Sequence, residues 1–125
     1  MGMEYSEFLQ ITQSEAGGDA GEAERAARAV LTTLGERLSR ENADALIPRL
    51  PDEIRPWLRT ERSAERFAVA EFLRRVAERE GVDTESAERD VRAVAAALRE
   101  AVGNEAYAGL TTRLPPDYTM LLPPP

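Results

Sequence analysis

Two dodecapeptides decide the fold expected of this chain: AERAARAVLTTL at residues 23–34 and AERDVRAVAAAL at residues 87–98. They begin 64 residues apart, and the register that aligns them extends without a gap over residues 7–58 and 71–122. Of the 52 aligned positions, 19 are identical. A match of this extent predicts that the chain contains one structural unit twice.

Each dodecapeptide belongs to a predicted long helix, because its apolar residues recur every three or four positions. The two stripes are Ala23, Ala27, Val30, Leu34 and Leu38 in the first copy, and Ala87, Val91, Val94, Leu98 and Val102 in the second.

A shorter helix should precede each long one. It should end at Gly17 in the first copy and at Gly81 in the second, and Ser6 or an earlier residue should cap the first. Asp83 or Thr84 should cap the second long helix.

Two further short helices should follow in each copy. The third helix should open at Ser39 and at Asn104, and the fourth near Pro51 and Pro115, because a proline ring fits a first helical turn. Pro48 has no proline counterpart, so the third helix of the first copy should end or kink earlier.

The fold class predicted from these elements is all-α. A single 52-residue unit would bury little apolar surface alone, so we expect a compact helical domain of two multi-helix repeats related by a pseudo-twofold axis. One domain should span residues 1–125, with repeats at 7–58 and 71–122, a polar linker at 59–66 and a tail at 123–125. If the linker instead extends the next helix, Ser63 should cap it.

The composition excludes much of ordinary enzymology. The chain has no Cys and no His, and all 16 basic residues are Arg. A thiolate nucleophile, a histidine base, a Schiff-base lysine and the commonest zinc ligands are therefore absent. We predict no catalytic residue, no cofactor-binding residue and no metal ligand.

The charge and the hydropathy indicate the setting of the protein. A formal net charge of -7 and a pI near 4.7 disfavour nucleic acid and anionic membranes as partners. The N-terminal residues lack the basic start and apolar stretch of a secretory signal. We expect a cytoplasmic protein that binds neither nucleic acid nor membrane.

The ordered series EFL, GVD, AER with RAV, and LP followed by an acidic residue resembles a bacterial family, domain of unknown function 2267. The resemblance covers about residues 4–122. It implies a compact α-helical bacterial protein and supplies no activity, ligand or catalytic residue.

The repeated arginines allow two interpretations. Glu24 with Arg28, and Glu88 with Arg92, have the spacing of helix-supporting ion pairs, and this is the interpretation we favour. The functional alternative is a pair of symmetry-related anion clamps made of Arg25, Arg28, Arg89 and Arg92.

Other motifs have simpler explanations than a binding site. Arg49 and Arg113 each precede Leu-Pro and should bond helix C-terminal carbonyls. The run VDTESAERD lacks the glycine and the final glutamate of a calcium loop, so N-capping is expected. Trp57 aligns with Leu121, which favours packing in the core or at a junction.

The sequence therefore predicts a noncatalytic helical interaction or assembly protein, with a protein partner or a homo-oligomer. The first alternative is a regulatory protein that binds a small molecule or an anion, and an enzyme ranks third. An exposed apolar patch would favour the first, an arginine-lined pocket the second and carboxylates of raised pKa in a cleft the third. The candidates for apolar patches are Ile47, Ile54, Trp57, Met120 and Leu121.

Overall fold

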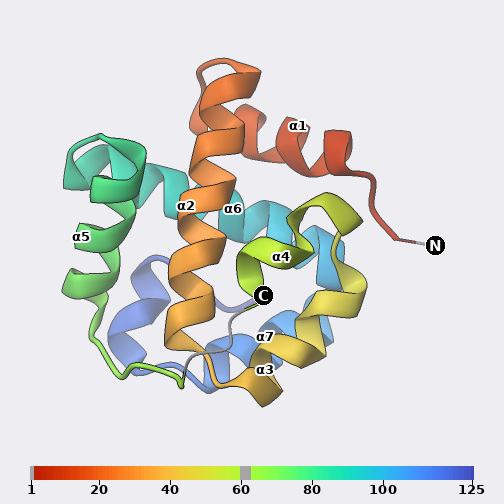
Figure 1. Cartoon of the computed structure of the whole chain (residues 1–125), viewed down its shortest axis with the longest axis vertical. Coiled ribbons are helices and arrows are strands. Elements are labelled where there is room, and N and C mark those ends of the chain that lie inside the picture. The colour runs from red at the N-terminus through yellow and green to blue at the C-terminus, as the bar shows by residue number, and fades with distance from the viewer. Residues whose placement is uncertain (1, 60–62) are drawn as a thin grey trace.

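The computed structural model describes residues 2–59 and 63–125, and every regular element within these ranges is a helix. The chain is all-α, as predicted. Figure 1 shows α2 in front and α6 crossing behind it, with the shorter helices around this pair. The α-helices of these ranges are α1 (Tyr5–Ala16), α2 (Ala20–Arg37), α3 (Arg40–Leu46), α4 (Arg55–Leu58), α5 (Val69–Glu80), α6 (Thr84–Val102) and α7 (Asn104–Thr112). Short 3-10 helices cover Ile47–Arg49, Asp52–Ile54 and Pro116–Met120.

The two long helices bury the stripes predicted for them. No stripe residue is more than 2% exposed. Each helix begins at an aspartate whose carboxylate accepts a backbone N–H of the first turn. Asp19 accepts from Glu22 at 2.8 Å, and Asp83 accepts from Ser86 at 2.7 Å, which confirms the predicted cap.

The helices before them end at the predicted glycines. Gly17 follows α1 with φ 82°, and Gly81 follows α5 with φ 71°. A positive φ carries no steric penalty at glycine, so both helices stop there.

Neither α1 nor α5 has a side-chain cap: α1 begins after Glu4, a residue earlier than Ser6 as the prediction allowed, and α5 begins too late for Ser63 to cap it. Residue Glu4 precedes α1 and Ala68 precedes α5, and neither side chain makes a capping bond. Ser6 lies inside α1, and Ser63 lies in extended chain before α5. Residues 60–62 of the predicted linker lie outside the described residues.

The third helices differ as Pro48 predicts. Ser39 caps α3 by accepting the N–H of Asn42 at 3.1 Å, and Asn104 is the first residue of α7. α3 ends at Leu46, whereas α7 ends at Thr112, two aligned positions later. A proline ring at position 48 cannot continue an α-helix there, so a 3-10 turn follows.

The predicted fourth helix is only partly right. Pro51 and Pro115 stand immediately before 3-10 helices rather than in the first turn of an α-helix. Only the first half continues into a single α-turn, α4.

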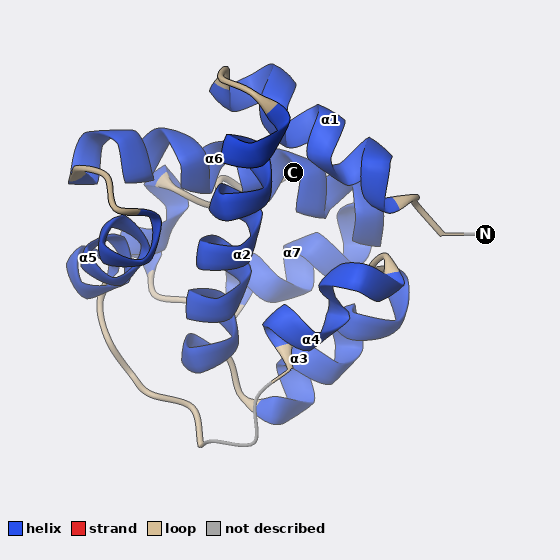
Figure 2. Cartoon of the chain, turned by 45° about the horizontal axis from the view of Figure 1, so that its top comes forward, coloured by secondary structure: helices blue, strands red, loops and turns tan. Residues whose placement is uncertain are grey.

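The first helix of each half packs on the long helices of both halves. α1 contacts α6 and α2, and α5 contacts α2 and α6. Figure 2 shows α1 and α5 on opposite sides of α2. Phe8 of α1 and its aligned residue Phe72 of α5 are fully buried in one hydrophobic cluster. That the two halves superpose by an approximate twofold stays a prediction.

Candidate functional site

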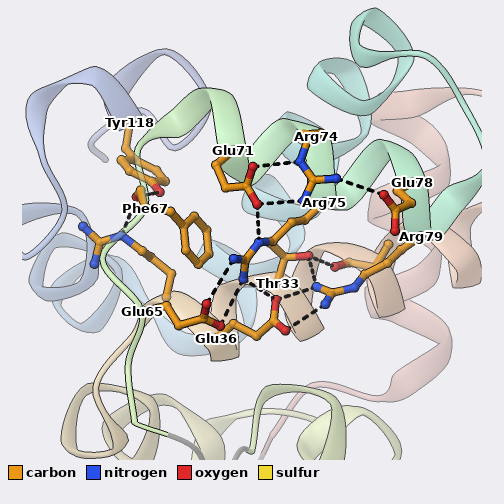
Figure 3. A network of polar contacts seen from close by, with 12 residues as sticks. Thr33, Glu36, Glu65, Phe67, Glu71, Arg74, Arg75, Glu78, Arg79 and Tyr118 are labelled. Carbon is orange, nitrogen blue, oxygen red and sulfur yellow. Dashed lines mark hydrogen bonds and ion pairs between the residues drawn. The ribbon is translucent and has the colours of Figure 1, made fainter.

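A network of ion pairs joins α2 to α5 (Figure 3). Its centre is Glu36, whose carboxylate accepts from Nη1 and Nη2 of Arg79 at 2.7 and 2.8 Å and from Nη1 of Arg75 at 3.2 Å. Arg75 also pairs with Glu65 and Glu71. The Glu36 side chain is only 16% exposed, whereas Arg79 is 33% and Glu65 is 44% exposed, so the network is buried at its centre and solvated at its rim.

The same network fixes the position of Arg79. Its Nη1 also donates to the Thr33 hydroxyl at 2.6 Å, so the guanidinium is held by two residues one turn apart on α2. These bonds, first that from Arg79, keep the pKa of Glu36 below its usual value although burial opposes this. The guanidinium of Arg79 is therefore held in a fixed position on the surface between α2 and α5.

A pocket lined by arginines opens beside this network. We call it the arginine pocket; its volume is about 280 Å³ and its lining is Arg25, Arg28, Ala29, Thr32 and Arg79. Arg25, Arg28 and Thr32 lie three and four residues apart on α2, which places them on one face of that helix. Neither Arg25 nor Arg28 forms an ion pair or a hydrogen bond with any residue in 2–59 or 63–125.

The two predicted helix-supporting ion pairs have different outcomes. Arg92 pairs with Glu88 at 2.6 Å, as predicted. The pair of Glu24 with Arg28 does not form, and Glu24 instead accepts from the Tyr5 hydroxyl at 2.9 Å. Burial, and then the bond to Glu24, raise the pKa of Tyr5 to about 12. Arg28 is left free to face the pocket.

The predicted anion clamps are not equivalent in the structure. Arg25 and Arg28 share the arginine pocket, whereas Arg92 donates instead to the backbone oxygen of Met120 at 3.0 Å. Arg89 pairs with Asp90 at 3.3 Å and lines a different cavity.

That second cavity, of about 60 Å³, lies where the end of α5 meets α2 and α6; we call it the carboxyl cavity. Glu80 and Asp90 line it together with Arg25 and Arg89. Asp90 is 6% exposed, and Oε2 of Glu80 is buried without a hydrogen-bond partner among the described residues. Burial, followed by the hydrogen bond with Asp90, raises the pKa of Glu80 to about 9. Glu80 is therefore protonated at neutral pH.

Sequence reasoning missed Glu80 and Asp90, although the repeat contains a signal for them. Their aligned residues in the first half are Ala16 and Ala26, and both alanines line the carboxyl cavity too. An acidic residue that aligns with an alanine of low exposure is a sign of a carboxyl group at the edge of the core. Glu80 and Asp90 thus both come from the second half, while the first half contributes the exposed Glu22 to the same lining.

Arg49 and Arg113 bond helix C-terminal carbonyls, as predicted. Arg49 donates to the oxygen of Val102, the last residue of α6, at 3.0 Å. Arg113 donates to Gly109 in the last turn of α7 at 3.3 Å.

The apolar candidates at the repeat ends are mostly core. Ile47, Ile54 and Leu121 are at most 4% exposed. Trp57 is partly buried, with its ring edge-on to Tyr5 at 6.2 Å, which agrees with the predicted packing role. Met120 is 69% exposed.

No three acidic residues lie close enough together in 2–59 and 63–125 to bind a metal ion. No helix in these ranges has the length and apolarity needed to cross a membrane.

Comparison with known proteins identifies the family. No curated protein matches the chain. The model of an uncharacterized conserved protein family, DUF2267, matches residues 5–121, nearly the whole chain. The chain belongs to the DUF2267 family.

Proposed function

We propose that the protein is a noncatalytic regulatory protein that binds a small anionic ligand, carrying a phosphate or carboxylate group, in the arginine pocket. The observation that carries this proposal is the pairing state of the arginines. Arg25 and Arg28 line a pocket of about 280 Å³, and neither forms a hydrogen bond or an ion pair among the described residues. A guanidinium donates up to five hydrogen bonds in a plane, a geometry that matches phosphate and carboxylate oxygens.

The third arginine contributes orientation more than charge. Glu36 holds Arg79 through two bonds of 2.7 and 2.8 Å, and a ligand meets a guanidinium already in place. A fixed donor loses less conformational entropy on binding than a mobile one. The Thr32 hydroxyl adds a neutral donor in the same lining.

The size of the arginine pocket and the net charge of the protein favour a small ligand over a polyanion. The pocket volume is just below the usual range for drug-sized ligands. With a formal net charge of -7, the protein repels nucleic acid over long distances, whereas a small anion responds to the local arginines.

The hypothesis of an interaction module has less support than the anion site, because three of its five candidate surface residues are buried. These are Ile47, Ile54 and Leu121, whereas Trp57 is partly buried. A protein partner or a second copy is the second candidate, favoured by the 69% exposure of Met120. Light scattering over a concentration range, with Met120→Gln as the variant, tests self-association.

Sulfate titration tests the proposed function. Isothermal titration calorimetry should detect sulfate and phosphate binding to the full chain, with acetate and citrate as a second arm for carboxylates. Arg28→Gln should weaken binding roughly tenfold or more, because a charge-assisted bond is lost. Arg99→Gln, at an exposed arginine on α6 outside the pocket, is the matched control and should change nothing. Equal losses in both variants, or no binding in any arm, would contradict the proposal.

A further inference from the structure

Arg25 lines both the arginine pocket and the carboxyl cavity. On the pocket side it lies beside Arg28 and Arg79. On the cavity side it acts electrostatically on Glu80. Because one guanidinium is common to both, a change in the charge of the carboxyl pair changes the potential in the pocket.

The geometry of the carboxyl pair favours one shared proton. Asp90 is 6% exposed, and the buried Oε2 of Glu80 has no donor among the described residues. Two ionised carboxylates in one small cavity repel each other. A proton on Glu80 removes the repulsion and supplies a donor for Asp90, in the way that other close carboxyl pairs hold one proton.

We infer that the Glu80–Asp90 pair makes anion binding in the arginine pocket proton-linked, so that the pocket binds an anion more tightly while the pair holds its proton. This inference rests on the proposed function and names the regulation of that site. Loss of the proton adds a negative charge beside Arg25 and lowers the positive potential that the ligand meets. By reciprocity, a bound anion strengthens the hold of the pair on the proton.

The charged groups that face the Glu80–Asp90 pair come from two helices. Arg89 belongs to α6, and Arg25 and Glu22 belong to α2. From α1 and the residue after it the cavity receives only the uncharged Ala16 and Gly17. Arginines keep their charge at all accessible pH values. With the pKa of Glu80 raised to about 9, the proton is lost between pH 7 and 10.5.

The carboxyl cavity itself is too small to be the ligand site. About 60 Å³ has room for water but not for an organic ligand. Its role is therefore to hold the proton, and the anion occupies the arginine pocket.

The test is to measure the affinity for sulfate at pH 7 and at pH 10.5 at constant ionic strength. Sulfate is suitable because its charge does not change over this range. The affinity of the unmodified protein should fall roughly twofold to fivefold. Glu80→Gln should keep the tighter affinity at both pH values, because a neutral amide copies the protonated carboxyl. Glu78→Gln is the matched control and should follow the unmodified protein, because Glu78 lies two residues before Glu80, is exposed and pairs with Arg74.

The titration of Glu80, followed by carboxyl ¹³C NMR, is a second readout that needs no variant. Its midpoint should lie near pH 9 and rise when sulfate is added. If sulfate binds and Arg28→Gln weakens it, but affinity is the same at both pH values, the coupling is wrong and the proposed function stands. If neither sulfate nor the carboxylates of the second arm bind at either pH, both are wrong. A midpoint near the usual value for glutamate also overturns the coupling.

Discussion

Gly35 of α2 packs directly against the backbone of Leu58 in α4, so closely that a β-carbon at Gly35 would lie 2.5 Å from the Leu58 carbonyl oxygen. We expect Gly35→Ala to destabilise the protein by about 1 to 3 kcal/mol, because backbone atoms cannot move aside as a side chain can. The gain in helix propensity from alanine, about 1 kcal/mol, is included in this balance. Urea denaturation measures the change.

The control is a second glycine inside a helix. At Gly109 of α7 a β-carbon would meet only the end of the Arg113 side chain at 3.5 Å. Gly109→Ala should therefore be neutral or stabilise by up to about 1 kcal/mol. Stabilisation by both substitutions would show that the backbone of α4 does not pack closely against α2 at Gly35.

Leu34→Ala and Leu98→Ala should each cost about 2 to 5 kcal/mol of unfolding free energy. The two leucines occupy aligned positions in α2 and α6 and are 0% and 1% exposed. Equilibrium urea melts check this, and a loss below about 1 kcal/mol would place either residue outside the core.

The sequence was sufficient for the helices because their determinants are local. The apolar period, the capping aspartates and the glycines after α1 and α5 each act within a few residues. Ser39 and Pro48 likewise act on their own helix, and both had the predicted effect on α3.

The candidate site could not be predicted in the same way, because its contacts join distant helices. Arg79 and Glu36 are 43 residues apart and meet only because α5 packs on α2. The repeat gives no guide, since Arg75 aligns with Ile11 and Arg79 with Glu15. The bond of Tyr5 to Glu24 also depends on the packing of α1 against α2.

Glu36→Gln should destabilise the protein by about 1 to 2 kcal/mol, because Arg75 and Arg79 lose their common charged acceptor in a poorly solvated position. Glu100→Gln, at the aligned residue in α6, is the control. Glu100 is exposed, so its substitution should stay within about 0.5 kcal/mol. Denaturant melts compare the two variants, and equal effects would mean that the network adds nothing to stability.

Stability should fall as pH rises from about 5 to 9, and Glu80→Gln should flatten this fall. Burial and the bond with Asp90 raise the pKa of Glu80 from 4.5 to about 9 in the folded protein. Between these values the folded state binds more protons than the unfolded state, so the unfolding free energy decreases with pH. The contribution is complete below pH 4.5 and is lost through pH 9.

Thermal melts from pH 5 to 9.5 at constant ionic strength separate this effect from the other titrations. Glu36 and Asp83 have lowered pKa values, so their contributions are lost only at more acidic pH. Tyr5, with its pKa raised to about 12, contributes only above pH 10. As pH rises, the melting temperature of the Glu80→Gln variant should therefore approach and then exceed that of the unmodified protein. Parallel curves for the two proteins would show that Glu80 ionises normally when folded.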